Sequence, residues 1–539
     1  MTRLANLLLQ QIKLTRFRVV LLSALLAVTV VDFTHAQTAE NDAPWFGLTL
    51  PPPFQAHRLP AIVGDRGPTP ARVPAGEESF TEFTGETIWQ DLETVVAFSK
   101  QSRDEQEIGS GQLWGRISGF PSSERTVEWM VERYQDVGIE QTDIQSFDQD
   151  EDASFWLPHA WELRIRGNDA FGAGSHDVVL ETAHPLSPSE LPGGRLSGEL
   201  VYVGTGSPAE LAHIDVNGKV AVQHITPQAH LVFERATTVP RSRDMFARGA
   251  LAVIIIVDQP GNEMARDFSN CGGPCFNVGG RDGHFLTGVL NAAAANGVSE
   301  PIQAEMTLET ETYRNLSAIN GIGVIPGSES DETIIINAHA DAWFDGAGDN
   351  GDGVAVQIAL ARHFAKPENQ PSRTLVFVAS AGHHTRGLNG PSAFVEMNPS
   401  LAENAVLAIN IEHVAQRNFS PARSEFEDGY REFIADSGEA PIVAGITNSA
   451  PFLESLFVEG VDRYGTNFVS DISTMASGEG GGYRAMGAPI ITTMQAPPLY
   501  HTSGEVIEAV SMPGLERMAR FLAFFIKAVD QAPREQIDP

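Results

Sequence analysis

Apolar strand-like runs alternate with helix-like segments in the second half of this 539-residue chain. Three runs have the character of buried strands, at residues 333–337, 374–379 and 405–411. Helix-like segments separate or follow them, at residues 353–364, 391–396 and 513–529. Strands that are apolar along their whole length are typical of sheets buried on both faces. We therefore expect an α/β fold with a mixed, mostly parallel sheet sandwiched by helices.

Between residues 196 and 310 the pattern changes to short β-like runs. They lie at residues 199–203, 219–223, 252–257 and 304–308, and a helical stretch at 244–248 precedes Gly249. The segments Gly218-Lys219-Val220-Ala221-Val222 and Gly249-Ala250-Leu251-Ala252-Val253-Ile254 resemble strand motifs of the protease-associated (PA) domain. The resemblance implies an inserted β-rich PA domain, which is usually a non-catalytic lid or a substrate-access module. An insertion without a functional role is the alternative.

The first 36 residues have the features of an export signal. Arg16 and Arg18 precede an apolar run over residues 19–31, and Thr34-His35-Ala36 offers a small-residue cleavage site. The run is shorter than the roughly 18 to 20 residues that span a bilayer, although an uncleaved anchor is an alternative.

The rest of the chain divides by composition and pattern. Residues 37–78 are rich in Pro, Ala and Gly and are typical of an extended lead-in. We expect residues 79–195 and 311–539 to form the two parts of one α/β domain. Residues 196–310 interrupt that domain, and its second part carries the candidate chemistry.

The chain is strongly acidic, with 36 Lys and Arg against 69 Asp and Glu and a formal net charge of -33. Nucleic acids and anionic membranes attract clustered Lys and Arg, so we expect no nucleic-acid partner and no membrane attachment after signal cleavage. We expect a secreted or periplasmic protein. The only cysteines, Cys271 and Cys275, flank a Gly-Gly-Pro turn. In an exported protein we expect them to form a small disulfide.

The candidate chemistry begins where the strand-like run at residues 333–337 ends. This strand delivers His339 to its carboxyl end, and Asp349 follows on a Gly-rich turn before a helix. Open α/β sheets bind ligands at the carboxyl ends of their strands. An imidazole and a carboxylate placed there can share a divalent metal, and Asp341 can orient the His339 ring.

Two other interpretations of this segment are weaker. Residues 346–351 match a G-x-G-x-x-G dinucleotide pattern, but Asp349 would put negative charge where a pyrophosphate lies. The acids between Asp341 and Asp352 could suggest a calcium loop. Trp343 occupies the third position of such a loop, and a strand rather than a helix precedes it.

The order of these motifs resembles the signature of the co-catalytic, two-zinc exopeptidases. That signature is His-x-Asp, then Gly-Ala-x-Asp-Asn, then a Gly-x-Ala helix, and it matches residues 339–355. The family includes secreted bacterial aminopeptidases and glutamate carboxypeptidase II. Residues 114–119 and 324–327 also resemble its N-terminal region and the stretch before its first ligand.

The resemblance implies a set of metal ligands. In the family one ion takes the His, a bridging Asp and a later acid, and the other takes the bridging Asp, a Glu and a last His. His339 and Asp349 match the first two positions, Glu412 matches the later acid, and His501 in Tyr500-His501-Thr502 matches the last His. Glu479 falls where the family has an Asp in a loop lining the site, and it receives no role here.

The third family motif is altered in this chain. The family has Ala-Glu-Glu-x-Gly-Leu, in which the first Glu is the general base and the second binds metal. Residues 382–388 read Gly-His-His-Thr-Arg-Gly-Leu instead. Counting forward from Arg373 puts His383 at the base position and His384 at the metal position, whereas counting back from Leu388 gives His384 and Thr385. We favour the forward count, because a turn tolerates an insertion better than a strand register does.

Imidazoles can take over both roles in chemical terms. Zinc binds a histidine nitrogen at about 2.0–2.1 Å, as well as it binds a carboxylate oxygen, so His384 can be a ligand. A neutral His383 can accept a proton. Two metals with altered base chemistry, a one-metal site and a metal-poor pseudo-enzyme are the three alternatives.

We therefore predict a secreted zinc-dependent hydrolase that cleaves peptide bonds, as an aminopeptidase does, or related amide bonds with metal-activated water. The resemblance implies two zinc ions and a peptide or small amide substrate. The predicted catalytic residues are His383 and Asp341, and the predicted metal ligands are His339, Asp349, His384, Glu412 and His501. The altered motif also leaves open a non-catalytic binding protein on the same fold and a hydrolase of non-peptide amides or esters.

Overall fold

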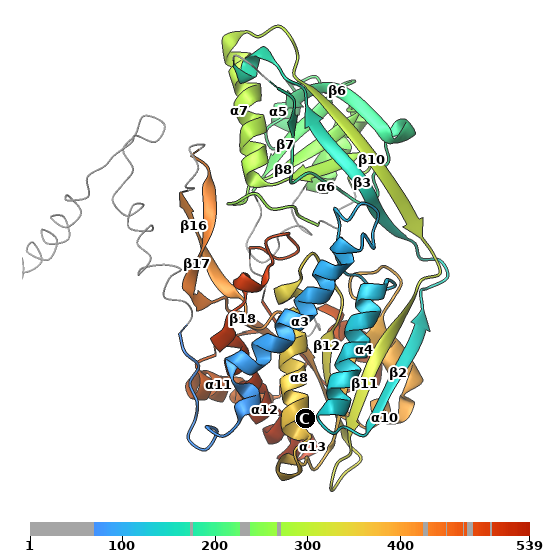
Figure 1. The fold of residues 1–539 in the computed structure, drawn as a ribbon, viewed down its shortest axis with the longest axis vertical. Helices are drawn as coiled ribbons and strands as arrows, with labels where there is room; N and C mark the ends of the chain where they lie inside the picture. The colour runs from blue at the N-terminus through green and yellow to red at the C-terminus, as the bar shows by residue number, and fades with distance from the viewer. Residues whose placement is uncertain are drawn as a thin grey trace, which may run out of the picture.

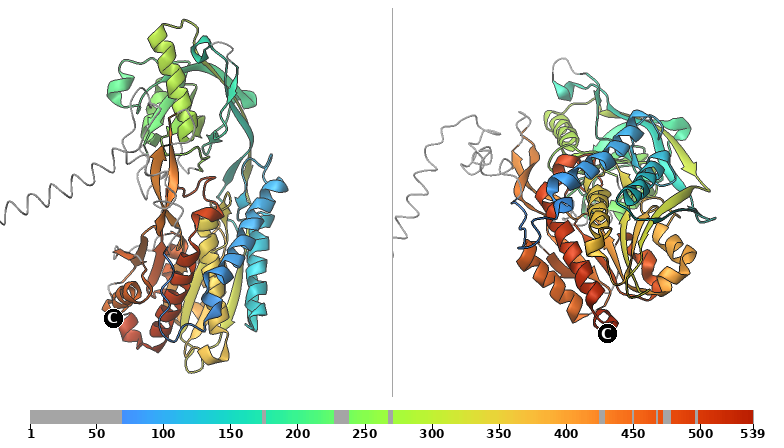
Figure 2. Two further views of the ribbon diagram at one scale, coloured as in Figure 1. Left: turned by 60° about the vertical axis from the view of Figure 1, so that its left-hand side comes forward. Right: turned by 60° about the horizontal axis from the view of Figure 1, so that its bottom comes forward.

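A computed structural model describes residues 69–172, 176–226, 238–266, 271–423, 429–448, 450–466, 468–471, 478–495 and 498–538. The predicted export signal and the predicted lead-in as far as residue 68 lie outside the described residues. The described chain forms a lower and an upper unit, each built around an eight-stranded sheet (Figure 1). Figure 2 shows the same two units stacked end to end after the molecule is turned about its vertical axis.

The lower sheet has the strand order β19-β18-β20-β15-β12-β14-β11-β2. Antiparallel pairing occurs between β18 and β20, between β14 and β11, and between β11 and β2. The four central strands are mutually parallel: β20 (Ile490–Met494), β15 (Ala405–Ile411), β12 (Thr333–His339) and β14 (Thr374–Ser380). The outer strands are β19 (Phe468–Asp471), β18 (Ile442–Ile446), β11 (Ser317–Ile325) and β2 (Gln141–Asp148). The expected α/β fold with a mixed, mostly parallel sheet is confirmed.

Alternate residues of the central strands pack into two different cores. Ile334 and Ile336 of β12 join one core, whereas Ile335 joins the other. This two-sided burial explains why the strands are apolar along their whole length. Helices of the first core are α3 (Gly85–Asp104), α4 (Pro121–Asp136), α8 (Asp352–Phe364), α11 (Pro451–Tyr464) and α12 (Met512–Gln531). The second core contains α9 (Gly390–Met397) and the 3-10 helix η7 (Gly478–Met486).

A buried chain of hydrogen bonds fixes α8 against the sheet. Tyr134 of α4 donates its hydroxyl to Gln357 Oε1 of α8 at 2.7 Å. Gln357 Nε2 donates to the carbonyl oxygens of Ile336 and Val378, at 2.8 and 2.9 Å. The Gln357 amide is fully buried, so it depends on all of these partners. These bonds hold the middle of α8 against β12 and β14.

The upper sheet has the strand order β4-β3-β10-β6-β7-β8-β9-β5. Its parallel part consists of β6 (Arg195–Tyr202), β7 (Val220–Ile225), β8 (Ala252–Val257) and β9 (Cys275–Val278). The described α-helices of this unit are α5 (Pro208–Leu211), α6 (Thr238–Ala247) and α7 (Gly280–Asn296). The long antiparallel strands β3 (Phe155–Ile165) and β10 (Gln303–Tyr313) lead from the upper unit toward the lower one (Figure 1).

The upper unit begins earlier than residue 196, where we placed its boundary. Strands β3, β4 (Val178–Val179) and β5 (His184–Pro185) belong to the same sheet as β6 to β10. The second half of β3 alternates buried and half-buried residues, with Glu162 and Arg164 between Trp161, Leu163 and Ile165. Such a strand lacks the continuous apolar run by which the other strands were predicted.

Cys271 and Cys275 do not form the predicted disulfide, and both are thiols in the structure. They are buried in a small apolar core of the upper unit that also contains Val203, Met245 and Val253. A buried cysteine behaves as a small apolar residue, and here packing accounts for both.

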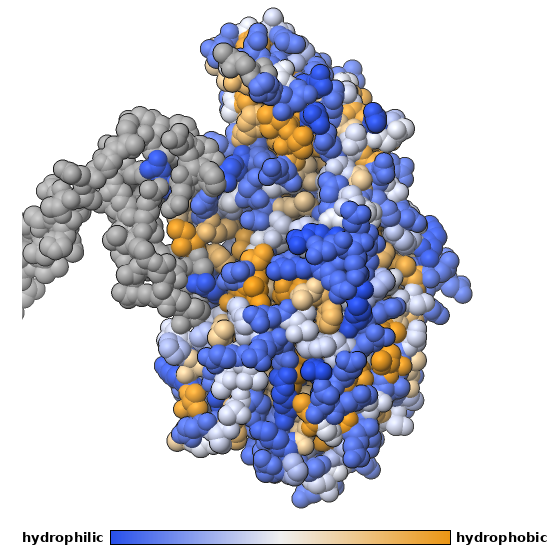
Figure 3. All heavy atoms as spheres, viewed as in Figure 1, coloured by the Kyte–Doolittle hydropathy of each residue, from blue (hydrophilic) through white to orange (hydrophobic). Residues whose placement is uncertain are grey.

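The face of the molecule in Figure 3 is mostly hydrophilic, with smaller apolar areas between the polar ones. None of the helices in the described part of the chain is both long and apolar enough for a membrane span.

We expect Tyr134→Phe to lower the free energy of unfolding by about 1–3 kcal/mol, because the buried Oε1 of Gln357 loses its donor. Urea unfolding followed by circular dichroism measures the change. Tyr202→Phe is the matched control, because Tyr202 is only half-buried, and it should change the free energy by less than about 0.5 kcal/mol. Equal losses in the two variants would contradict the role of the hydrogen bond.

Candidate functional site

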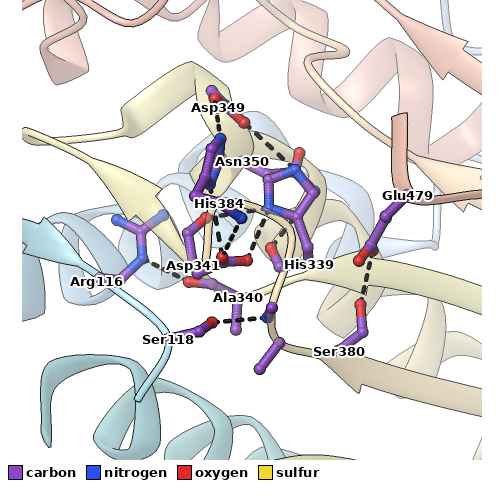
Figure 4. A network of polar contacts seen from close by, with 12 residues as sticks. Arg116, Ser118, His339, Ala340, Asp341, Asp349, Asn350, Ser380, His384 and Glu479 are labelled. Carbon is purple, nitrogen blue, oxygen red and sulfur yellow. Dashed lines mark hydrogen bonds and ion pairs between the residues drawn. The ribbon is translucent and has the colours of Figure 1, made fainter. Parts of the chain in front are cut away.

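The candidate site lies at the carboxyl ends of the parallel strands β12, β14 and β15. His339 is the last residue of β12, and His383 and His384 follow the end of β14. Glu412 and His413 follow the end of β15 directly. Figure 4 shows His339, Asp341, Asp349 and His384 converging at this edge of the sheet. These predicted residues therefore lie together at one edge of the sheet, because parallel strands bring their carboxyl ends to the same edge.

Asp349 stands at the centre of the cluster and is fully buried. It belongs to the short η5 helix (Ala347–Gly351) that precedes α8. Its Oδ1 lies 3.3 Å from His339 Nε2 and 2.8 Å from His413 Nε2. Its Oδ2 lies 3.2 Å from His384 Nε2 and 2.8 Å from His501 Nε2. Each carboxylate oxygen thus faces its own pair of imidazoles.

Asp341 sits behind two of these imidazoles. Its Oδ1 lies 3.4 Å from His339 Nδ1, and its Oδ2 accepts a hydrogen bond from the backbone N–H of His384 at 2.8 Å. His384 Nδ1 lies 3.5 Å from the same Oδ2. Asp341 therefore faces the side of each ring that points away from Asp349, in the position of a residue that orients ligands.

The turn that carries His383 and His384 is held from a neighbouring segment. Gly382 N–H donates to Ser118 Oγ at 2.7 Å, and Thr385 Oγ1 donates to the Ser118 carbonyl at 2.9 Å. Figure 4 shows Ser118 beneath this turn. These bonds anchor the turn on both sides of the two histidines.

His383 lies at the edge of the cluster and opens onto a cavity. Its ring centroid is 4.5 Å from that of His339 and 4.6 Å from that of His384. The cavity has a volume of about 280 Å³, and its lining comes from residues 382–383, 385–391, 478–479 and 481–482. Burial, with help from the neighbouring His339 and His384, holds the pKa of His383 well below its ordinary value. A neutral imidazole that borders a cavity can accept a proton there.

Glu412 is buried but does not contact Asp349 in the structure. Its Oε1 accepts hydrogen bonds from Asn410 Nδ2 at 2.7 Å and from the backbone N–H of Glu479 at 3.1 Å. The Glu479 side chain accepts from Asn337 and from Ser380 Oγ and reaches the same cavity as His383. Burial raises the pKa of Glu479 to about 7.

His413 received no role from the sequence, yet it contacts the central carboxylate. Besides its Nε2 contact with Asp349, its Nδ1 donates to the Gln495 carbonyl at 2.7 Å. A single histidine is more often structural than a ligand, and no family motif marks this position. The sequence feature that could have identified His413 as a site residue is its position directly after Glu412, at the end of a buried strand.

Arg116 is buried beneath the loop that links His339 to Asp349. Its guanidinium donates to the carbonyl oxygens of Ala340 at 2.9 Å, Asp345 at 3.1 Å and Gly346 at 3.1 Å. Burial lowers the pKa of Arg116 to about 10, which leaves it charged at neutral pH. This cation fixes the backbone of the loop and offsets part of the negative charge of the buried carboxylates.

The loop that carries His501 is bound to the upper unit. Ala265 and Thr502 form an antiparallel β-bridge, in which Arg266 N–H donates to the His501 carbonyl at 2.9 Å. The Ser503 hydroxyl donates to Glu263 Oε2 at 2.8 Å, and its backbone N–H donates to Met264 O at 2.8 Å. The upper unit thus helps to hold one of the cluster histidines.

The imidazoles of the cluster differ in protonation when no metal is bound. Burial opposes the charged forms of His384 and His413, but the Asp349 carboxylate outweighs it and raises both pKa values to about 9. Burial lowers the pKa of His501 to about 4. At neutral pH the cluster therefore combines charged and neutral imidazoles around one carboxylate.

These residues fit a metal-binding site. Among the described residues, four groups of three side chains have donor atoms within 4.8 Å of one another, and two of them, His339–Asp349–His413 and Asp349–His384–His501, share Asp349. His339 Nε2 and Asp349 Oδ2 are buried and make no hydrogen bond. A metal ion would satisfy such atoms, and imidazole with carboxylate is a donor set that suits zinc and similar transition metals.

Comparison with known sequences agrees with this site. Residues 320–526 match the sequence profile of Peptidase family M28. Over 131 residues the chain is 37% identical to a "Probable glutamate carboxypeptidase" of Arthroderma benhamiae, covering 23% of this chain and 18% of that protein. It is 26% identical over 241 residues to Aminopeptidase YwaD of Bacillus subtilis, covering 43% of this chain and 46% of that protein. The chain thus matches less than half the length of these two curated relatives.

Comparison with solved structures agrees with the fold. The zinc aminopeptidase BSAP of Bacillus subtilis superposes with a TM-score of 0.53 at 16% identity, covering 82% of this chain and 97% of that chain. A peptidase M28 precursor from Shewanella amazonensis gives a TM-score of 0.55 at 17% identity, covering 83% and 97%. At this level of identity the likeness establishes the shared fold.

We expect the metal-free protein to lose stability as pH rises from about 6.5 to 9. The folded-state pKa values of His384 and His413 are raised to about 9, above the unfolded value of about 6.5. Their ion pairs with Asp349 therefore contribute fully below about pH 6.5, and the contribution disappears as pH approaches 9. The melting temperature in a chelator across this range measures the effect.

Asp349→Asn is the control for this pH dependence, because it removes the charge that both imidazoles share. Its melting temperature should vary less between pH 6.5 and 9 than that of the unaltered protein. A melting temperature of the unaltered protein that stays constant over this range would contradict the expectation.

Proposed function

We propose that this chain, which carries a domain of peptidase family M28 at residues 320–526, is an exported two-metal hydrolase of peptide or related amide bonds. Its activity, its substrate and the number of ions are parts of this proposal. The protease-associated character of the upper unit stays a prediction from the sequence.

The arrangement around Asp349 is the observation that carries the proposal. Oδ1 of Asp349 faces His339 and His413, whereas Oδ2 faces His384 and His501. A carboxylate that offers one oxygen to each of two imidazole pairs has the geometry of a bridge between two metal ions. The first ion would be held by His339, Asp349 and a residue at the end of β15, and the second by Asp349, His384 and His501.

The metal ions would supply Lewis acidity, which polarises a carbonyl group and makes a bound water acidic. The protein supplies orientation. Asp341 holds the His339 and His384 rings from the side away from Asp349, and Arg116 fixes the loop between His339 and Asp349. Removal of such supporting groups typically costs about 10- to 100-fold in metal affinity or activity.

His383 is the residue that we assign to proton transfer. It borders the cavity of about 280 Å³ and lies beside His339 and His384. Its low pKa keeps an imidazole nitrogen free to accept a proton from water at neutral pH. The cavity would hold the part of the substrate next to the bond that is cleaved.

Metal content and hydrolysis together test the proposal. After zinc loading and desalting, we expect about two zinc ions per chain and hydrolysis of amino-acid amides or short peptides. His384→Ala should lose zinc and lose more activity than the roughly 10- to 100-fold that removal of a supporting residue costs. His213→Ala is the matched control, because His213 is exposed on the upper unit, and both readouts should stay unchanged.

The other outcomes distinguish the alternatives. Protein that retains no zinc would refute the two-metal mechanism. Protein that retains zinc but hydrolyses no peptide or amide would favour a binding protein on the same fold, and activity restricted to esters would identify a different hydrolase.

Export of the chain is a separate part of the proposal and rests on residues 1–36. Arg16, Arg18 and the apolar run that follows them support a cleaved signal. We expect the mature protein to begin at Gln37 and to be found in the periplasm or the medium, which N-terminal sequencing of the exported fraction measures. An intact N-terminus on cell-associated protein would contradict cleavage.

A further inference from the structure

We propose that His413, and not the preceding Glu412, completes the first metal position together with His339 and Asp349. This inference rests on the proposed two-metal site and changes the ligand that the sequence predicts. The site would then use four imidazoles, from His339, His384, His413 and His501, around the single bridging carboxylate of Asp349.

The His413 ring is oriented as a metal ligand. Its Nδ1 donates to the Gln495 carbonyl at 2.7 Å, which fixes one proton on Nδ1, so that a metal ion displacing the other proton would meet the lone pair of Nε2. Nε2 lies 2.8 Å from Asp349 Oδ1, the same oxygen that faces His339. This orientation by a backbone carbonyl is the usual arrangement of a histidine whose other nitrogen binds metal.

The backbone of His413 is fixed in an uncommon conformation. Its φ is +46°, a region that residues other than glycine rarely adopt. Its N–H donates to Asn350 Oδ1 at 3.2 Å, and its carbonyl accepts from Gln495 N–H at 2.9 Å. Such a conformation persists only where the surrounding structure holds it, and it is commonest at functional sites. Here it directs the side chain toward Asp349.

Glu412 is held away from the bridging carboxylate. Asn410 Nδ2 and Glu479 N–H both donate to its Oε1. The backbone of Gly478, at a φ of +54°, packs so closely that an added Cβ would lie 2.1 Å from both Glu412 oxygens. Among the described residues, Glu412 shares a possible ligand group with His339 and His383 but not with Asp349.

A site of four imidazoles and one carboxylate has a defined metal preference. Imidazole nitrogen suits zinc, copper, nickel and cobalt, whereas magnesium, calcium and manganese prefer sites made of oxygen atoms. Replacing the carboxylate of Glu412 by the imidazole of His413 also removes one negative charge from the ligand set. We therefore expect cobalt to replace zinc readily and magnesium to bind poorly.

Cysteine substitution with cobalt tests the assignment directly. A thiolate bound to Co²⁺ gives a charge-transfer absorption that imidazole and carboxylate ligands lack. We expect this absorption in Co²⁺-loaded His413→Cys and none above the unaltered protein in Glu412→Cys. The unaltered protein corrects for Cys271 and Cys275, which lie in the core of the upper unit. Two results would overturn the proposal. One is charge-transfer absorption in Glu412→Cys, whether or not His413→Cys also absorbs, and the other is the absence of this absorption from both variants.

A second measurement needs no substitution and is independent of whether a variant folds. Protein labelled with ¹⁵N in its histidines and loaded with ¹¹³Cd²⁺ should show nitrogen–cadmium couplings for four imidazoles. If Glu412 is the ligand, the count is three and the proposal is wrong.

The metal measurements also separate this inference from the proposed function. Neither depends on turnover of a substrate. The ligand assignment alone would be overturned if the protein binds cobalt and hydrolyses peptides, but its cadmium form shows nitrogen–cadmium couplings for only three imidazoles. Protein that binds no metal would overturn both.

Discussion

The burial of the Asp349 carboxylate is the constraint on which the site depends. A carboxylate removed from water at the end of a sheet is costly unless opposite charges or metal ions surround it. Four imidazoles approach it from four different segments, and Arg116 adds a cation beneath the adjoining loop. The strand ends, the η5 helix and the position of α8 are therefore connected through a single buried charge.

The fold of the lower unit was largely predictable, because the burial of its strands is reflected directly in the apolar residues of the sequence. Strands β12, β14 and β15 are buried on both faces, so their apolar runs identify them without further information. Their carboxyl ends meet at one edge, which is why the sequence alone predicts that His339 and His384 lie near each other. The motif on the Gly-rich turn predicted that Asp349 belongs to the site. No predicted strand end precedes His501, so its place in the site was predicted from the family resemblance alone.

What the sequence did not reveal depends on contacts between distant segments. The contact of His413 with Asp349 depends on a backbone turn that Gln495 and Asn350 hold in place. Gln495 lies in no motif, and the motif that contains Asn350 does not indicate its bond to the His413 backbone. Arg116 acts through three carbonyl groups more than 200 residues away. The thiols of Cys271 and Cys275 fill a core that local spacing does not reveal. In each case the residues in contact are far apart in the sequence, whereas a sequence motif covers only a short segment.

The β-bridge between Ala265 and Thr502 has a consequence for how such a protein can change over evolutionary time. An insertion joined only at its two ends can be lost or exchanged as a separate module. Here the upper unit also supplies backbone partners to the loop that carries His501, so its removal would leave that loop without part of its support. We therefore expect the two units to be inherited together, and a chimaera with a foreign insertion to need a matching segment 498–505 to rebuild the site.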